Sequence, residues 1–307
     1  MPITTSSVRL VSISSLIAPV LTEPAFAARV ESVFADAVNL RTQAGHYVAL
    51  VSQRVGNGPI NAVVEPPFLL AVLRPGDQVR GDGRRLRLGH GWELDLHAAE
   101  VWDPRPDYER LARWPQVLRA NLRRLRSEVP LEAPPSSLAA APAFHTQGAF
   151  GSRPAMALIQ SHASELISGL RRAYRAGNLT WIRVFAQRLA GLGPGLTPAG
   201  DDWLAGWLVG LRARAALDEE DVPFLPVEVV GDAVLEAAQD QTNDLSLAFL
   251  RAAAAGAVTQ AWHQLLEALT NADPVALRDA VTEVLSHGGT SGADTLAGFL
   301  AAFEDDR

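Results

Sequence analysis

The run of glycine and proline from Gly191 to Gly200 constrains this chain more than any other segment. It reads Gly-Leu-Gly-Pro-Gly-Leu-Thr-Pro-Ala-Gly, with four glycines and two prolines in ten residues. Glycine adopts backbone conformations that other residues avoid, and proline fixes φ, so this segment is a loop of specified shape. Thr197-Pro198 then predicts a helix start, with Thr197 as N-cap and Pro198 at the first helical position.

Hydrophobic residues recur at helical spacing through residues 151–307. Behind the loop, Trp203, Leu204 and Trp207 begin one such series, so the helix there is expected to enter a core. Asp273-Pro274 predicts another helix start, with Asp273 as cap. We expect helices near residues 154–176, 179–190, 198–216, 227–240, 244–256, 258–270, 274–286 and 292–304. Residues 151–307 are therefore predicted to form an all-helical C-terminal domain.

Short β-like segments separated by turns fill most of residues 1–105. Candidate strands lie near residues 30–35, 46–52, 61–64, 68–73, 84–88 and 92–96. Clusters of Gly, Pro, Asn and Asp separate them, as is typical of turns. Many short strands at close spacing indicate a small barrel or sandwich. The predicted class is α+β, with a β-rich barrel- or sandwich-like N-terminal domain before the helical one.

Two other segments are read from their composition. Residues 10–21 imitate a secretory signal, but Arg9 alone supplies charge and three serines interrupt the apolar run. We prefer a short N-terminal helix packed on the β-rich domain of a cytoplasmic protein. No run of about 18 apolar residues is present to span a membrane. Between the two domains, residues 106–150 are expected to form an Arg-rich helix with a solvated face, followed by a Pro/Ala-rich linker.

The composition excludes several kinds of chemistry. There is no Cys, which removes thiol nucleophiles and thiolate metal sites. All 27 basic residues are Arg, so Schiff-base chemistry and a P-loop lysine are also excluded. The net charge of -7 predicts that nucleic acid is not a partner.

A second segment repeats the helix start that follows the glycine loop. Gly200-Asp-Asp-Trp-Leu-Ala-Gly-Trp-Leu208 reappears as Gly292-Ala-Asp-Thr-Leu-Ala-Gly-Phe-Leu300, which aligns Asp202 with Asp294. Each copy follows a loop that contains Gly and Thr. We expect two helix starts of the same construction that face each other in one site. A simpler interpretation is two capped helices that pack closely, with Ser291 and Asp294 in a capping box.

The first loop has more glycines than a helix cap requires, which favours a binding role. Helix N-termini attract anions, and glycine lets a ligand approach the backbone. The loop is not a P-loop, because Asp201-Asp202 stands where that motif needs Lys and Ser or Thr. Carboxylates near an anion need a bridging Mg²⁺, an Arg from elsewhere or an amide-bearing substrate. Asp201, Asp202 and Asp294 are therefore also candidate Mg²⁺ ligands.

Around these motifs we name the following candidates. The catalytic candidates are Asp201, Asp202 and His287, because carboxylates and imidazole can move protons. The substrate-binding candidates are Gly193, Gly195, Thr197, Gly200, Thr242, Asn243, Thr290, Ser291, Asp294 and Asn57. The segment that contains Thr242 and Asn243 also fits a plain N-cap.

At these residues the chain resembles the AllH-like family, whose named member is a subunit of oxamate carbamoyltransferase. The resemblance is carried by 191–202, by Gln241-Thr-Asn-Asp-Leu-Ser246, by His287-Gly-Gly-Thr-Ser-Gly-Ala-Asp294 and by Gly56-Asn-Gly-Pro59. It departs from the family pattern at Ala199, where the family has Ser, and at Gly289 and Ala293. The loss of the Ser hydroxyl removes any catalytic role at position 199.

The resemblance implies carbamoyl transfer between carbamoyl phosphate and a small amide or carboxylate such as oxamate, in a complex with other carbamoyltransferase subunits. Two alternatives remain open from the residues alone. One is a non-catalytic subunit that binds a small ligand or acts as a scaffold. The other is a Mg²⁺-dependent hydrolase or phosphotransferase that uses the Asp cluster.

Overall fold

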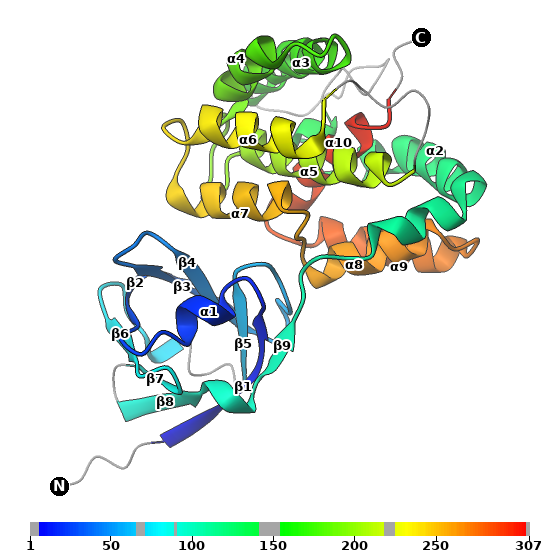
Figure 1. Ribbon diagram of the computed structural model, residues 1–307. Helices are drawn as coiled ribbons and strands as arrows, with labels where there is room; N and C mark the ends of the chain where they lie inside the picture. The colour runs from blue at the N-terminus through cyan, green and yellow to red at the C-terminus, as the bar shows by residue number, and fades with distance from the viewer. Residues whose placement is uncertain (1–5, 66–70, 89–90, 141–153, 218–224, 305–307) are drawn as a thin grey trace, which may run out of the picture. The chain divides into compact units, whose positions relative to one another are not determined.

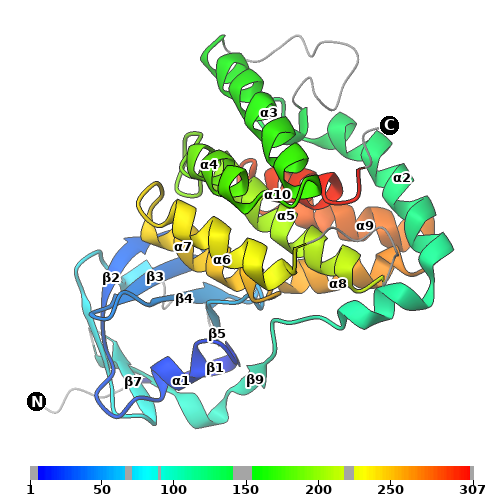
Figure 2. The same cartoon turned by 45° about the horizontal axis from the view of Figure 1, so that its top comes forward.

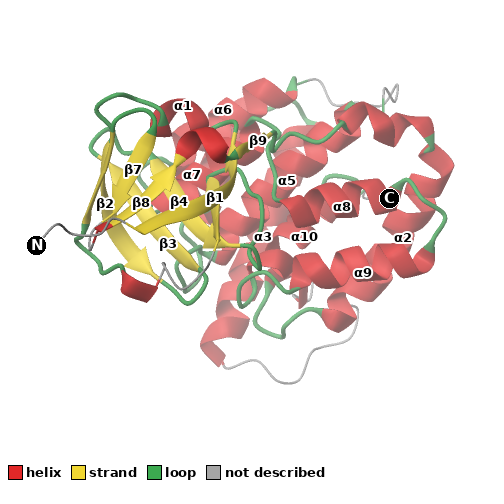
Figure 3. Cartoon of the chain, turned by 90° about the horizontal axis from the view of Figure 1, so that it is seen from below, coloured by secondary structure: helices red, strands yellow, loops and turns green. Residues whose placement is uncertain are grey.

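The chain forms two compact units in a computed structural model that describes residues 6–65, 71–88, 91–140, 154–217 and 225–304. The first unit is Met1–Arg105 with Val258–Gln260, and the second is Pro106–Ala257 with Ala261–Arg307. The described strands all belong to the first unit, and the long helices build the second (Figure 3). The predicted α+β class is confirmed.

The described residues of the first unit form a curled nine-stranded sheet (Figure 1). Its strands are β1 Ser6–Ser14, β2 Ala27–Val33, β3 Ala37–Thr42, β4 Tyr47–Ser52, β5 Asn61–Glu65, β6 Gln78–Gly81, β7 Arg85–Leu88, β8 Trp92–Asp95 and β9 Glu100–Trp102. They lie in the order β5-β4-β3-β2-β6-β7-β8-β1-β9, and β1 also pairs with β5. This additional antiparallel pairing turns the sheet back on itself, so the barrel-like alternative is the observed one.

The N-terminal segment is a strand where we expected a helix. One edge of β1 pairs antiparallel with β5, and its other edge pairs in parallel with β8 and β9. Only Ala18–Leu21, the helix α1, is helical in this segment. Leu10 and Ile13 are buried, because β1 completes the core of the curled sheet. A short apolar run does not distinguish a buried strand from a buried helix, which explains the error.

Four of the expected strands correspond closely to β4, β5, β7 and β8, and 30–35 overlaps β2. Of the candidate at 68–73, residues 68–70 lie outside the described residues, and residues 71–73 form no strand. Strands β3, β6 and β9 were missed, because β6 and β9 are only four and three residues long and β3 includes the polar Asn39, Arg41 and Thr42. In this sheet, hydrogen bonds to neighbouring strands stabilise such segments more than their own composition does.

The second unit is helical along its described length. Its helices are α2 Pro115–Glu132, α3 Pro154–Arg175, α4 Leu179–Leu189, α5 Ala199–Ala215, α6 Val227–Ala238, α7 Asp244–Ala254, α8 Gln260–Leu269, α9 Pro274–Leu285 and α10 Ser291–Ala301. From α3 onward, each expected helix coincides with an observed one to within a few residues at either end. Asp273 caps α9 as predicted, since its side chain accepts from the N–H groups of Val275 and Ala276. No described helix is both long and apolar enough to cross a bilayer.

Helices α5 and α10 form the core of this unit, and Figure 2 shows them side by side. Most residues of both helices are buried, including Trp203, Trp207 and Phe299. The two helices approach closely at glycine. A Cβ on Gly206 would lie 1.8 Å from the Thr295 carbonyl oxygen, and one on Gly298 would lie 2.0 Å from that of Trp203.

Between residues 106 and 140, a 3-10 turn at Tyr108–Arg113 precedes α2. Helix α2 buries Leu118, Leu122 and Leu125 and leaves Arg119 and Arg123 exposed, as an amphipathic helix with a solvated basic face would. Within the segment expected to be a linker, Leu138–Ala140 form a buried 3-10 turn that contacts α10. Residues 141–150 of that segment lie outside the described residues.

Candidate functional site

The loop before α5 owes its shape to three glycines with positive φ. These are Gly191 at 73°, Gly193 at 115° and Gly195 at 114°. Packing explains two of them, because a Cβ on Gly191 would lie 2.2 Å from the Gln241 carbonyl oxygen and one on Gly193 would lie 3.0 Å from the Ala199 nitrogen. Around Gly195 the nearest such atom is 3.7 Å away, so only its φ requires glycine there.

The fourth glycine of the loop also has a packing explanation. A Cβ on Gly200 would lie 2.0 Å from the carbonyl oxygen of Leu189, at the end of α4. Glycine at this position therefore lets α4 turn tightly into α5. Much of the glycine excess that favoured a binding role is thus required by the fold itself, and Gly195 is the exception.

Asp201 fastens this loop to the start of α7. Its Oδ1 accepts from the Gly191 N–H at 2.9 Å, and its Oδ2 accepts from the Thr242 hydroxyl. The Asn243 amide donates to the Leu196 carbonyl at 2.9 Å, while its own side-chain oxygen caps α7. Burial raises the pKa of the Asp201 carboxyl, against the hydrogen bonds from Thr242 and Gly191. Both carboxyl oxygens of Asp201 therefore hold the glycine loop against the segment that leads into α7.

A second loop, before α10, meets the first one. The hydroxyls of Thr197 and Ser291 lie 2.9 Å apart and join the two loops directly. Both helix starts differ here from the predicted caps. Helix α5 begins at Ala199 with Pro198 as its N-cap residue, and α10 begins at Ser291 with Thr290 there. Neither N-cap side chain makes a capping bond. Thr197, which was predicted to be the cap of α5, uses its hydroxyl to bridge the two loops.

Asp202 and Asp294 occupy equivalent positions in the first turns of α5 and α10. Asp294 is fully buried, and its Oδ1 accepts from the Leu138 N–H at 2.5 Å, so it does not form the predicted capping box. Its Oδ2 and the Oδ2 of Asp202 are both buried and have no hydrogen-bond partner among the described residues. A buried polar atom without a partner is rare and marks a position where a ligand group or water can bind.

Burial dominates the electrostatics of this pair. It raises the pKa of Asp202 to about 8, while the hydroxyls of Ser291 and Thr197 act to lower it and the charge of Asp294 raises it further. Burial likewise raises the pKa of Asp294 to about 7, against the Leu138 N–H and the Thr290 side chain. Near neutral pH the pair therefore retains protons that exposed carboxyls would have lost.

The loops also present backbone donors. No acceptor within the described residues takes the N–H groups of Gly193, Gly195 or Leu196. The exposed tip of the loop, at Pro194 to Leu196, carries two of these groups. Neighbouring N–H groups beside a helix start make a concave donor site suited to an anion.

Three predicted residues have a different setting. The Nδ1 of His287 lies 2.8 Å from the carbonyl oxygen of Glu283 in the preceding helix α9, which leaves Nε2 for other contacts. Asn57 belongs to the first unit, where it accepts from the Ser12 hydroxyl at 2.6 Å and donates to Gln260 at 3.1 Å. Thr290 is the N-cap residue of α10, and its side chain acts to lower the pKa of the Asp294 carboxyl.

For metal binding, no group of three His, Asp or Glu side chains among the described residues is arranged to hold an ion.

Leu138 was not among the predicted residues. Its contact with Asp294 joins residues 156 positions apart, and nothing in the local sequence signals it.

Known families match both units. Residues 189–303 match the family described as oxamate carbamoyltransferase subunit AllH, and residues 9–101 match the AllH family N-terminal domain. The chain belongs to the AllH family. No solved structure matches it. The first of these AllH segments contains both loops, α5 and α10, and the second contains Asn57. The family description is of a subunit, which implies other carbamoyltransferase subunits.

Proposed function

We propose that this AllH-family chain is a carbamoyltransferase subunit whose paired loops bind carbamoyl phosphate and a small amide or carboxylate such as oxamate. The observation that carries the proposal is the junction at Thr197 and Ser291, which brings two equivalent helix starts together beside Asp202. The description of the matched family supplies the reaction class.

The groups at this junction suit the two reactants. The free N–H groups of Gly193, Gly195 and Leu196 would hold the phosphate or the carboxylate. The Thr197 and Ser291 hydroxyls would donate to the carbamoyl oxygen, where negative charge grows as the carbonyl is attacked. A carboxylate oxygen of Asp202 or Asp294 that lacks a partner would accept an N–H from an amide substrate.

In the proposed transfer, a nitrogen of the acceptor attacks the carbonyl carbon of carbamoyl phosphate. A C–N bond forms, the C–O bond to phosphorus-bound oxygen breaks, and inorganic phosphate leaves. The attacking nitrogen loses a proton, which the ionised form of Asp202 would accept because its raised pKa makes it a stronger base than an ordinary carboxylate. His287, through its Nε2, is the second candidate for this proton.

The test is phosphate release from carbamoyl phosphate plus oxamate, with the full chain alone and with its partner subunits. Asp202→Asn and Asp294→Asn together should lower the rate by about 100-fold or more, as is typical when acid–base groups are removed. Asp232→Asn, an exposed carboxylate on α6, is the matched control and should leave the rate unchanged. A double variant as active as the control would exclude this site.

The same assay separates the alternatives. A non-catalytic subunit, which the word subunit in the family description also allows, would bind carbamoyl phosphate or oxamate without releasing phosphate. A Mg²⁺-dependent hydrolase or phosphotransferase would release phosphate without oxamate and only when Mg²⁺ is added. If neither reactant nor Mg²⁺ shifts the thermal unfolding of the chain, a scaffold role is favoured.

A further inference from the structure

Residues 241–243, which lead into α7, contact the glycine loop and the first turn of α5 at three places. The contacts pair Gln241 with Gly191, Thr242 with Asp201 and Asn243 with Leu196. The last of them reaches the exposed tip of the loop at residues 194–196. Within the described chain, no other hydrogen bond holds this tip, so its conformation depends on the Asn243 side chain.

The side chain of Asn243 uses its two polar atoms for different purposes. Its Oδ1 accepts from the Ser246 N–H at 3.0 Å and caps α7, while its Nδ2 donates to the Leu196 carbonyl at 2.9 Å. A cap requires only the oxygen, and Ser or Asp supplies that oxygen about as well as Asn does. The bond from Nδ2 to the loop is therefore a feature of Asn243 that the cap does not explain.

The bond to Leu196 sets the direction of the peptide unit between Leu196 and Thr197. In a trans peptide unit the C=O and the N–H point in opposite directions. Because the Leu196 carbonyl points to Asn243, the Thr197 N–H points away from the start of α7. No acceptor within the described residues takes this N–H, and the hydroxyl of the same residue lies at the junction with Ser291. The Thr197 N–H is thus a further open donor beside the proposed site.

Packing alone does not fix this part of the loop. Gly195 has a φ of 114°, and the nearest atom to a Cβ there would be 3.7 Å away, so neighbouring side chains do not hold it. Backbone donors bind an anion well only when they are oriented before the ligand arrives, because otherwise binding must order the loop. A side-chain bond to the Leu196 carbonyl supplies that orientation.

We infer that Asn243 is a positioning residue for an oxyanion that the loop binds in the carbamoyltransferase proposed above, on which this inference rests. Asn243 holds the peptide unit between Leu196 and Thr197, so that the Thr197 N–H donates to a phosphate or carboxylate oxygen together with the N–H groups of Gly195 and Leu196. Asn243 itself does not touch the ligand. The motif at residues 241–246 thereby acts on the reaction through the glycine loop.

Steady-state kinetics of phosphate release, with the full chain and its partner subunits, test this role. Asn243→Ser keeps a capping oxygen and removes the amide, and it should raise KM for the substrate whose oxyanion is held by about tenfold. A rise for carbamoyl phosphate identifies the phosphate, and a rise for oxamate identifies the carboxylate. The value of kcat should stay within about a factor of two, because the lost interaction binds ground state and transition state alike. Asn243→Asp keeps the cap but faces the Leu196 carbonyl with a carboxylate, so it should raise the same KM at least as much.

The matched control is Asn178→Ser at the start of α4. Asn178 caps that helix by accepting from the Trp181 N–H, and its amide donates to no acceptor among the described residues. The control should leave both KM values unchanged, and its thermal unfolding should resemble that of Asn243→Ser, because each variant keeps a serine cap.

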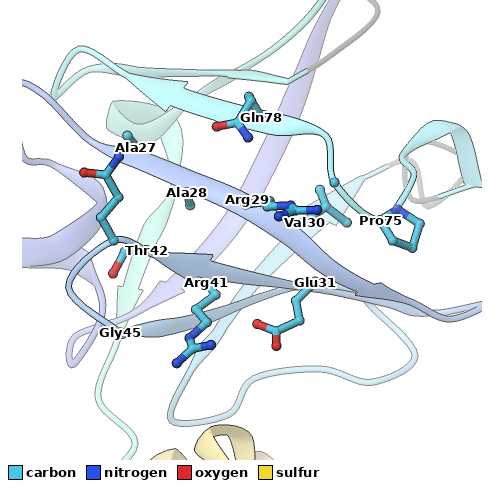
Figure 4. A pocket seen from close by; sticks show the side chains of 12 residues that line it. Ala27, Ala28, Arg29, Val30, Glu31, Arg41, Thr42, Gly45, Pro75 and Gln78 are labelled. Atoms are coloured by element: carbon cyan, nitrogen blue, oxygen red, sulfur yellow. The ribbon is translucent and has the colours of Figure 1, made fainter.

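Backbone amide signals of Leu196 and Thr197, followed by nuclear magnetic resonance during titration with inorganic phosphate and with oxamate, give a measurement that does not depend on turnover. At least one of the two probes should shift both signals in the native chain, and should shift them much less in Asn243→Ser. A cavity of about 670 Å³ on the first unit, lined by Arg29 and Gln78 (Figure 4), is a competing place for either probe. Arg29→Gln should leave the shifts at Leu196 and Thr197 unchanged.

The outcomes separate this inference from the proposed function. Native turnover with Asn243→Ser and Asn178→Ser equal in both KM values would overturn the role of Asn243 and leave carbamoyl transfer standing. Shifts at both amides that Asn243→Ser abolishes, without any turnover, would support the role of Asn243 and exclude carbamoyl transfer. If neither probe shifts the two amides, or if Arg29→Gln weakens binding and Asn243→Ser does not, the loop is not the oxyanion site and the inference is wrong.

Discussion

The two helix–loop–helix segments that carry the repeat, α4 to α5 and α9 to α10, are similar at the start of their second helix and different in their loops. Gly206 contacts the Thr295 backbone, and its equivalent Gly298 contacts the backbone of Trp203, which is the equivalent of Thr295. The glycine of each helix thus packs against the same backbone position of the other helix. This reciprocity indicates a local pseudo-two-fold relation between α5 and α10 and explains why the repeated sequence is rich in small residues.

The loops have diverged within this symmetric frame. The loop before α5 has three glycines with positive φ and is tied down by Asp201, whereas the loop before α10 has only Gly288 in that conformation. Ala293 stands at the position equivalent to Asp201. The shared glycines Gly206 and Gly298 therefore serve the helix contact, and the glycines found in one copy alone shape the first loop.

The largest loss of stability should come from changes to the two equivalent glycines, Gly206 and Gly298. Gly206→Ala and Gly298→Ala should each lower the free energy of unfolding by at least about 2 kcal/mol, because each added Cβ meets backbone that cannot move without separating the helices. Chemical denaturation of both variants measures this. Gly289→Ala, where a Cβ meets nothing within 4 Å, should change stability little. A large loss in only one of the two variants would contradict the reciprocal contact.

A smaller effect, on how the free energy of unfolding depends on pH, should distinguish the buried Asp202 carboxyl from exposed carboxyls. The unfolded chain loses the Asp202 proton near pH 4, whereas the folded chain holds it to about pH 8. The folded state binds more protons in this window, so the free energy of unfolding should fall as pH rises, by up to about 1.4 kcal/mol per pH unit for this group. Asp202→Asn should lose this component of the slope, as measured by denaturation between pH 5 and pH 8.

Asp232→Asn serves as the control for that titration, because Asp232 is exposed on α6. Its slope should match that of the native chain. If Asp202→Asn has the same pH dependence as this control, the Asp202 carboxyl is ionised in the folded chain and does not hold a proton.

The smallest effect should come from the link between the loops. Thr197→Val or Ser291→Ala removes the hydroxyl bridge and should cost about 0.5–1.5 kcal/mol. The double variant should cost less than the sum of the two single ones, because both remove the same bond. Thr282→Val, whose hydroxyl donates to its own helix, should instead add independently to Ser291→Ala. Full additivity of Thr197→Val with Ser291→Ala would mean that the bridge does not form in solution.

Local sequence patterns determined the helices and several of the strands. Helical periodicity and capping residues such as Asp273 and Asn243 act within one or two turns, so they can be read along the chain. The repeat and the motifs around Asp202 and Asp294 likewise indicated that two helix starts would meet. The family, too, followed from these motifs, and the matches over residues 9–101 and 189–303 confirm it.

Only the tertiary structure decided what the individual polar groups do. Thr197 reads as a cap but bridges to Ser291, and Asp294 reads as part of a capping box but takes the Leu138 N–H. The strand β1 reads as a helix but closes the curled sheet. The physical reason is the same in each case. A hydroxyl, a carboxylate or a short apolar run can satisfy its bonding locally or with a distant partner, and the choice depends on which partner folding brings within reach.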